Sequence, residues 1–281
     1  LLLADGFGQL GAQSALLAEK FNLWNAQRAM TIVLPSTLLV MLPVLGEVSL
    51  VPVVGIYFVC TLLGTVMGTW LLIRAKFHRG GKVDWKSSLQ LWLGTATDSV
   101  GARVDQLILA ASGSAAALGV YAVAVTCSQV SSGFSQGLNH VAFGRQASMG
   151  SVRESRMHER RLGASSLATG AVLSVLVFLF GDFVFGPGYE PLWWVVCLVV
   201  LGQTFVDQWQ WQVFWRMSRA LTGSVLAISA FALVLYGVAL VAVVVADVVS
   251  LLAIALCFLG FVFLRYVVSL VHAGGLARKG F

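Results

Sequence analysis

Charged residues are scarce in this sequence. Asp, Glu, Lys and Arg make up 11% of its 281 residues, and hydrophobic residues make up 58%. A soluble domain of this length carries roughly 25% charged residues, because it needs them to cover its surface. The mean hydropathy of +0.88 fits the same interpretation. We therefore expect a polytopic membrane protein.

Motifs of metal, cofactor and enzyme chemistry are also lacking. The four cysteines lie far apart in apolar runs, without Cys-x-x-Cys spacing and without a neighbouring His or carboxylate cluster. No Ser/His/Asp arrangement and no Gly-rich phosphate loop stands out. We expect no metal, no cofactor and no enzymatic activity.

Long hydrophobic runs fill most of the chain. A bilayer core takes roughly 20 helical residues, and a scan at that length predicts spans at 29–45, 48–73, 88–112, 115–143, 162–185, 190–215, 221–245 and 249–271. Residues 1–18 resemble the end of an earlier helix, since the chain opens on LLLADGFG with neither Met nor a signal-peptide pattern. The prediction is an all-α transmembrane helical bundle with about eight complete spans, preceded by a partial N-terminal helix.

Lys and Arg lie in alternate connections between these spans. The exceptions are Arg103 and Arg265, which fall inside spans, and the connections near 46, 113, 187 and 247 contain no Lys or Arg. By the positive-inside rule, the basic connections and the C-terminus are cytoplasmic. The formal charge of +6 therefore reflects membrane topology, and we expect no nucleic-acid partner. Basic connections can also attract anionic lipid headgroups.

The span at 88–112 is unusual because it contains Asp98, Arg103 and Asp105. Wound as one continuous helix, it has a polar arc that holds all three charges and an apolar arc opposite. Charges at bilayer depth normally face a bundle interior or a water-filled cavity. We expect Arg103 to bind an anionic group and the two Asp to accept hydrogen bonds from hydroxyls. Ion pairs with other helices remain an alternative. Arg265 is expected to extend its side chain to the headgroups and to have no function.

Two later spans carry further polar stripes. The first holds Gln129, Gln136 and Asn139, and the second holds Gln203 and Asp207. We interpret the four amide residues as substrate-binding candidates and Asp207 as an ion-coupling candidate. Close helix packing, or a hydrogen-bonded structural role for Asp207, remains an alternative.

The sequence also resembles a known family. The segment RVDQLILAASGSAAALGVYAVAVTCSQV, with VAFGRQAS after it and FNLWNAQRAMTIVLPSTLLV before it, is similar to the polysaccharide-biosynthesis flippases of the multidrug, oligosaccharidyl-lipid and polysaccharide exporter superfamily. Arg103 and Asp105 match the family's Arg-x-Asp pair, and Gly119, Tyr121 and Ala124 match the opening of its next helix. The segment departs from the family pattern at Gly144, where Pro is common.

The resemblance implies two six-helix lobes in an inverted V. Residues 1–81 would be a truncated N-lobe, with the end of helix 4 and helices 5 and 6, and residues 82–281 would be the C-lobe, with helices 7–12. The chain would flip a polyprenyl-diphosphate-linked oligosaccharide across the plasma (inner) membrane by alternating access. Polysaccharide polymerase and glycosyltransferases would be its partners, together with membrane lipids.

Other interpretations stay open. A cation-coupled multidrug exporter of the same superfamily is the nearest one, although Arg103 suits a cationic substrate poorly. A membrane-embedded polysaccharide polymerase or ligase would need reactive groups on a substantial outer loop, and the outer connections here are short and contain no Lys, Arg or His. A lipid-binding or scaffold protein that transports nothing is the third alternative.

Overall fold

The computed structural model describes residues 20–41, 50–74, 84–112, 115–146, 152–186 and 189–278. Within these ranges the regular structure is helical and contains no β-strand. The expected all-α helical bundle is therefore confirmed.

The chain divides into two compact units, residues 1–82 and 83–281. The described helices of the first unit are α2 (Phe21–Arg28), the π-helical segment η1 (Ala29–Val33), α3 (Leu34–Met41) and α4 (Leu50–Arg74). In this unit α4 packs against α2, η1 and α3, and Trp24 and Leu71 are buried against each other. The correspondence of the two units to the lobes of an exporter stays a prediction.

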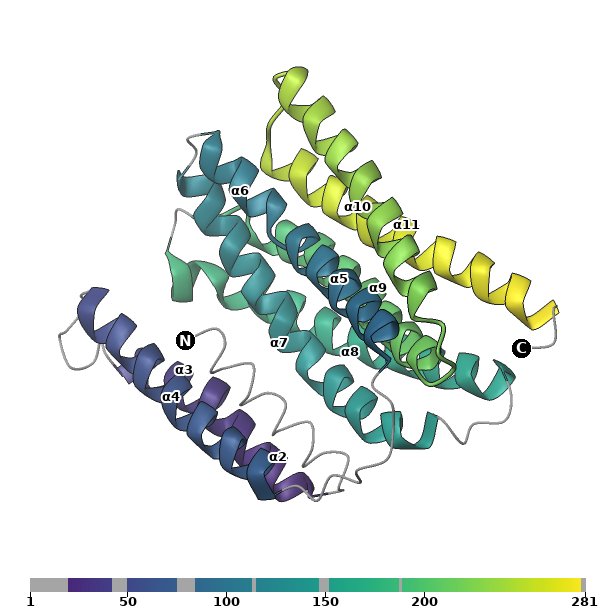
Figure 1. Cartoon of the computed structure of the whole chain (residues 1–281). Coiled ribbons are helices and arrows are strands. Elements are labelled where there is room, and N and C mark those ends of the chain that lie inside the picture. The colour runs from purple at the N-terminus through teal and green to yellow at the C-terminus, as the bar shows by residue number, and fades with distance from the viewer. Residues whose placement is uncertain are drawn as a thin grey trace. The chain divides into compact units, whose positions relative to one another are not determined.

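The second unit contains the longer helices. They are α5 (Trp85–Gly101), α6 (Val104–Ala111), α7 (Ala115–Gln146), α8 (Val152–Phe185), α9 (Leu192–Met217), α10 (Thr222–Val245) and α11 (Leu251–Arg278). Helix α9 packs against α7, α8 and α11, while α10 packs against both α5 and α11 (Figure 1). Consequently α9 is the most enclosed of the six long apolar helices, since 56% of its most apolar stretch of 18 residues is buried.

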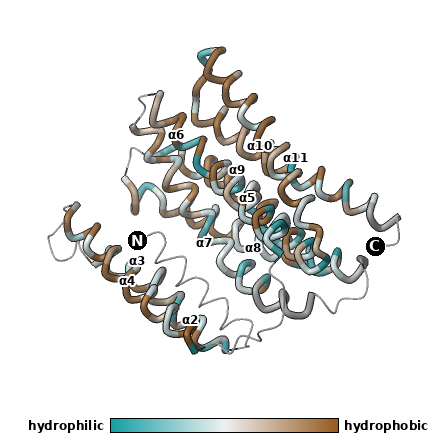
Figure 2. Tube along the Cα trace, viewed as in Figure 1, coloured by the Kyte–Doolittle hydropathy of each residue, from teal (hydrophilic) through white to brown (hydrophobic). Residues whose placement is uncertain are grey.

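Six described helices are long and apolar enough to cross a membrane, namely α4 and five helices of the second unit, α7 to α11. Figure 2 shows that α10 is hydrophobic over almost all of its length. The protein is thus a multi-pass membrane protein. The sequence predicted about eight spans, and the two that are not among these six are 29–45, which lies partly outside the described residues, and 88–112.

The span predicted at 88–112 is not one helix. Its first helix, α5, is capped by Asp84. The Asp84 side chain accepts hydrogen bonds from the Ser87 hydroxyl and from the Ser87 backbone N–H. These two hydrogen bonds lower the pKa of the Asp84 carboxyl below its ordinary value, and the bond from the Ser87 hydroxyl has the larger effect. Helix α5 ends at Gly101, and α6 starts again after Arg103, whose φ of −131° and ψ of −18° are not helical. The single continuous helix was therefore a wrong prediction.

Close contacts of small residues set the helix spacing in the second unit. Gly170 on α8 faces Val200 on α9, and a Cβ added at Gly170 would overlap the Val200 Cγ1 atom. Val200 is buried and its branched side chain has few rotamers. The α8–α9 distance therefore depends on the absence of a side chain at Gly170.

This contact predicts that Gly170→Ala destabilises the protein. Overpacking of a tightly packed site costs about 1–3 kcal/mol, so the unfolding midpoint of the detergent-solubilised protein should fall. Gly133→Ala is the matched control, because a Cβ at Gly133, also within a helix, meets nothing within 4 Å. Equal midpoints for the two variants would contradict the role of Gly170.

Candidate functional site

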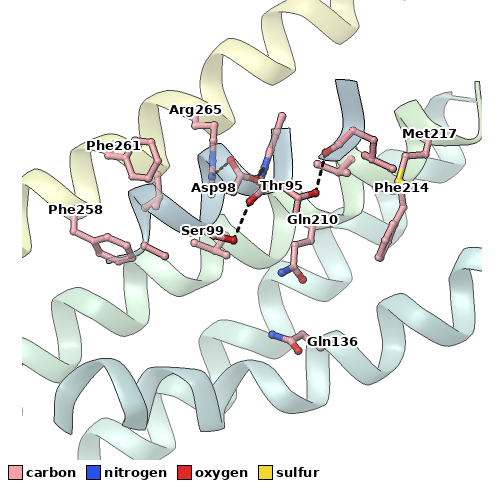
Figure 3. Close-up of a pocket in the computed structure, with 16 residues that line it drawn as sticks. Thr95, Asp98, Ser99, Gln136, Gln210, Phe214, Met217, Phe258, Phe261 and Arg265 are labelled. Carbon is pink, nitrogen blue, oxygen red and sulfur yellow. Dashed lines mark hydrogen bonds and ion pairs between the residues drawn. The ribbon is translucent and has the colours of Figure 1, made fainter. Parts of the chain in front are cut away.

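A cavity of about 500 Å³ lies within the second unit, between four helices. Its lining residues come from α5, α7, α9 and α11: Leu91, Thr95, Asp98, Ser99, Ala102, Gln136, Val206, Trp209, Gln210, Val213, Phe214, Met217, Phe258, Phe261, Val262 and Arg265. Figure 3 shows polar side chains from α5 and α11 on one side and Gln136 from α7 on the other, with Gln210 between them. The cavity is thus lined by both polar and apolar groups.

The polar wall on α5 follows from helical spacing. Thr95, Asp98, Ser99 and Ala102 are three or four residues apart, so they share one face of the helix. The Thr95 hydroxyl donates to the carbonyl of Leu91, and the Ser99 hydroxyl donates to that of Thr95. Because these donors are satisfied within the helix, the wall is polar without an unpaired hydroxyl hydrogen.

An ion pair joins two walls of the cavity. The Arg265 NH1 atom on α11 lies 2.8 Å from Asp98 Oδ1 on α5, and Trp209 Nε1 on α9 donates to Asp98 Oδ2 at 2.8 Å. The side chain of Arg265 is 3% exposed and that of Asp98 is 28% exposed. Loss of Asp98 would therefore leave a buried and unpaired cation, whereas loss of Arg265 would leave a carboxylate that is still partly exposed.

Aromatic rings complete the surroundings of Arg265. Its guanidinium carbon lies 5.3 Å from the centre of the Trp209 ring and 5.0 Å from that of Phe261, at distances where ring faces attract cations. The Nε atom of Arg265 has no hydrogen-bond partner among the described residues. The predicted extension of Arg265 to the headgroups is wrong, because Asp98 and two rings stabilise it inside the bundle.

Two amides add hydrogen-bonding capacity to the cavity. Gln136 and Gln210 are both half-buried, and the Gln136 amide nitrogen donates to the Ser132 hydroxyl at 3.1 Å. This bond positions the Gln136 side chain and leaves its carbonyl oxygen to accept a further bond. Three Phe rings line the remaining surface, at positions 214, 258 and 261.

Arg103 and Asp105 do not line this cavity. Arg103 is exposed at the break between α5 and α6, where its NH1 atom donates to Gln106 Oε1 at 3.3 Å. Asp105 is 1% exposed and accepts hydrogen bonds from the Tyr121 hydroxyl at 2.5 Å and from the backbone of Gln106 at 2.7 Å. The break separates three charges that one continuous helix would place on the same arc, and the binding roles of Arg103 and Asp105 stay predictions.

A second buried network contains the ion-coupling candidate. The Asp207 carboxylate accepts from Ser166 at 2.6 Å and from Gln203 at 3.2 Å, and its side chain is fully buried. The Asn139 amide nitrogen lies 3.5 Å from the Asp207 backbone carbonyl oxygen. The structure thus brings Asn139, Gln203 and Asp207 together, and none of the three lines the cavity. Gln129 is exposed and belongs neither to this network nor to the cavity wall.

A third network was missed by sequence reasoning. Arg216, which the sequence assigned to a cytoplasmic connection, lies fully buried in the last turn of α9. Its guanidinium donates to Gln212 Oε1 and to the backbone carbonyl of Ser269, and the Gln212 amide donates to buried Glu159 at 2.6 Å. The sequence offered one signal for this network. Arg216 directly follows the predicted span 190–215, and Gln212 lies one helical turn before it. Among the described residues, no group of three or more His, Cys, Asp or Glu side chains could hold a metal ion.

The asymmetric burial of the ion pair predicts asymmetric mutational costs. Asp98→Ala leaves a cation that is 3% exposed without its partner, so it should cost about 3–5 kcal/mol. Arg265→Met leaves a partly exposed carboxylate that Trp209 still binds, so its cost should be smaller. Unfolding midpoints in detergent measure both effects.

The double variant is the control for this prediction. Asp98→Ala with Arg265→Met removes the orphaned charge and should be more stable than Asp98→Ala alone. A double variant that is less stable than either single variant would contradict the assignment of the cost to an unpaired cation.

Comparisons with known proteins give no further assignment. No protein-family model, no curated protein and no solved structure matches this chain. What the chain does must therefore be argued from its composition, its helices and the cavity between them.

Proposed function

We propose that this protein is a membrane transporter that flips a polyprenyl-diphosphate-linked oligosaccharide from the cytoplasmic to the outer leaflet by alternating access, without enzymatic chemistry. The observation that carries the proposal is the cavity of about 500 Å³ inside a multi-pass helical bundle, with an ion pair and two amides in its wall. Cavities of roughly 300–1,000 Å³ are the usual size for ligand sites. In this proposal the cavity takes part of the headgroup, while the lipid tail stays in the bilayer.

The lining chemistry suits a glycosylated, anionic headgroup. Carbonyl and amide groups of Gln136 and Gln210 would hydrogen-bond to sugar hydroxyls, and the rings of Phe214 and Phe258 would pack against the apolar faces of the sugar. Arg265 supplies the cation, and its Nε donor has no hydrogen-bond partner in the described part of the chain. A guanidinium binds phosphate oxygens in a bidentate manner and stays protonated.

Ion exchange at Arg265 would connect binding to movement. Arg265 on α11 is neutralised by Asp98 on α5. A diphosphate that binds Arg265 would compete with Asp98 and so weaken the link between α5 and α11. Asp98 would keep its hydrogen bond from Trp209, which lowers the cost of this exchange. The proposed partners remain the polymerase and glycosyltransferases that consume and supply the lipid-linked glycan.

A cation-coupled multidrug exporter is the second candidate. The aromatic lining, with Trp209, Phe214, Phe258 and Phe261, favours it because such rings also bind organic cations. Under this interpretation Asp98 would bind the drug, and Arg265 would be its competitor.

Lipid mass spectrometry of cells that lack this protein tests the proposal. Complete lipid-linked repeat units should accumulate, and the wild-type gene should reverse the accumulation. Gln136→Ala should restore export about tenfold less well than wild type, because a lost hydrogen bond costs about 1–1.5 kcal/mol. Gln129→Ala is the control on the same helix, since Gln129 is exposed and does not line the cavity, and it should complement fully.

Each other outcome has a distinct meaning. An unchanged lipid profile in the deletion strain would contradict the flippase and favour the multidrug exporter. Accumulation of polymerised glycan would instead favour a polymerase or ligase. Equal complementation by Gln136→Ala and Gln129→Ala would remove this cavity from the transport path.

A further inference from the structure

Helix α8 is longer than a bilayer requires. Its 34 residues, Val152–Phe185, extend over about 51 Å at 1.5 Å per residue, whereas the hydrocarbon core is about 30 Å thick. The described side chains of the N-terminal turns include Arg156, Arg160 and Arg161, all exposed, whereas residues 162–185 contain no Lys or Arg. These three arginines therefore belong to the part of α8 at the level of the lipid headgroups.

The arginines share one face of these turns. At 100° per residue, Arg160 lies at about 40° and Arg161 at about 140° from Arg156, with Met157 between them at about 100°. The buried side chains Ser155, Glu159 and Leu162 all lie on the opposite face, at about 240–300°. The exposed arc therefore presents three guanidinium groups and one flexible apolar side chain.

Contacts with α9 hold the opposite face in place. Trp211 Nε1 donates to the Ser155 hydroxyl at 3.2 Å, and the Gln212 amide donates to Glu159 at 2.6 Å. The ring of His158 stacks on that of Trp211, with centroids 5.8 Å apart. These turns are thus docked to α9, and a ligand of the arginines need not order the backbone first.

No salt bridge within the described residues neutralises the charges of this face. Glu159 is the one carboxylate between residues 155 and 162, and it lies on the buried face with Gln212 as its partner. The described residues form no salt bridge with Arg156, Arg160 or Arg161. Arg156 is attracted to Glu159 without a salt bridge, and the three cations outnumber this one carboxylate, which leaves a local positive field.

The same face continues into the lipid-facing surface of α8. Leu167, Val175 and Phe178 are exposed large hydrophobics, at about 20°, 100° and 40° on the same wheel. Leu167 is seven residues beyond Arg160, or roughly 10 Å along the axis. A lipid whose first acyl carbons lie against Leu167 therefore has its phosphate near Arg160.

We propose that Arg156, Arg160 and Arg161 form a binding site for the phosphate headgroups of anionic phospholipids in the leaflet at the N-terminal end of α8. Arginine forks bind phosphate oxygens in a bidentate manner, and Met157, 47% exposed, lies where glycerol and the first acyl carbons would pack. Three neighbouring cations favour a headgroup with net negative charge over a zwitterionic one. The site is independent of what the cavity transports.

Native mass spectrometry of the full chain tests this site. The protein is released from nanodiscs that hold equal amounts of phosphatidylglycerol and phosphatidylcholine, and retained lipids are counted. Wild type should retain mainly phosphatidylglycerol. Arg156→Gln/Arg160→Gln/Arg161→Gln should reduce the ratio of retained phosphatidylglycerol to phosphatidylcholine roughly a hundredfold, given the usual contribution of each of three basic residues at a membrane surface.

The matched control removes the same charge elsewhere. Lys20, Arg74 and Lys86 are exposed and lie outside α8, so Lys20→Gln/Arg74→Gln/Lys86→Gln should keep the wild-type ratio. Arg160→Gln alone should give an intermediate ratio, which covers the case of a misfolded triple variant. Equal losses in both triple variants would reduce the effect to net charge and overturn the site. A wild type that retains added polyprenyl diphosphate but shows no preference for phosphatidylglycerol would overturn it too, and would assign the arginines to a lipid-linked diphosphate.

Discussion

The buried charge of Arg265 is the constraint on which the second unit depends. A guanidinium cannot lose its proton to avoid the cost of burial, so the bundle must supply an anion and hydrogen-bond acceptors at that depth. Asp98 supplies the carboxylate from a helix 167 residues away in sequence, and Trp209 binds the other carboxylate oxygen from a third helix. One ion pair therefore fixes α5, α9 and α11 around the cavity. The same three helices provide all but one of the residues that line it.

The hydrophobic pattern predicted the helices well because each span must satisfy its own backbone hydrogen bonds in lipid. That constraint is local, so α4 and α7 to α11 could be predicted from runs of apolar residues. The break at Arg103 was not predictable in the same way. It depends on tertiary contacts, since Asp105 is held by Tyr121 of α7 and a Cβ at Gly101 would meet the Phe261 ring at 2.8 Å. A helical wheel drawn through the break placed Arg103 and Asp105 on the wrong arc.

Polar residues were recognised in the sequence, but their grouping was not. Spacing along one helix reveals a stripe, whereas the partner of each stripe lies on another helix. Gln203 and Asp207 therefore pair with Ser166, while Gln210, one turn further along α9, faces the cavity with Asp98. Arg265 was given no function because its side chain was expected to extend to the headgroups. Charges at bilayer depth rarely remain unpaired. Asp98 by itself therefore indicates a buried cation on another helix, and Arg265 is that cation.

Trp209 connects the two buried arginines of α9 and α11. Its ring centre lies 5.3 Å from the guanidinium carbon of Arg265 and 5.7 Å from that of Arg216. Arg216 has no direct salt bridge among the described residues, and Gln212 instead links it to Glu159 by accepting from the cation and donating to the carboxylate. A neutral amide thus separates the two opposite charges while both stay hydrogen-bonded. Any movement of Trp209 that follows a change at Asp98 would alter the surroundings of both arginines, so the cavity and the network at the end of α9 are physically continuous.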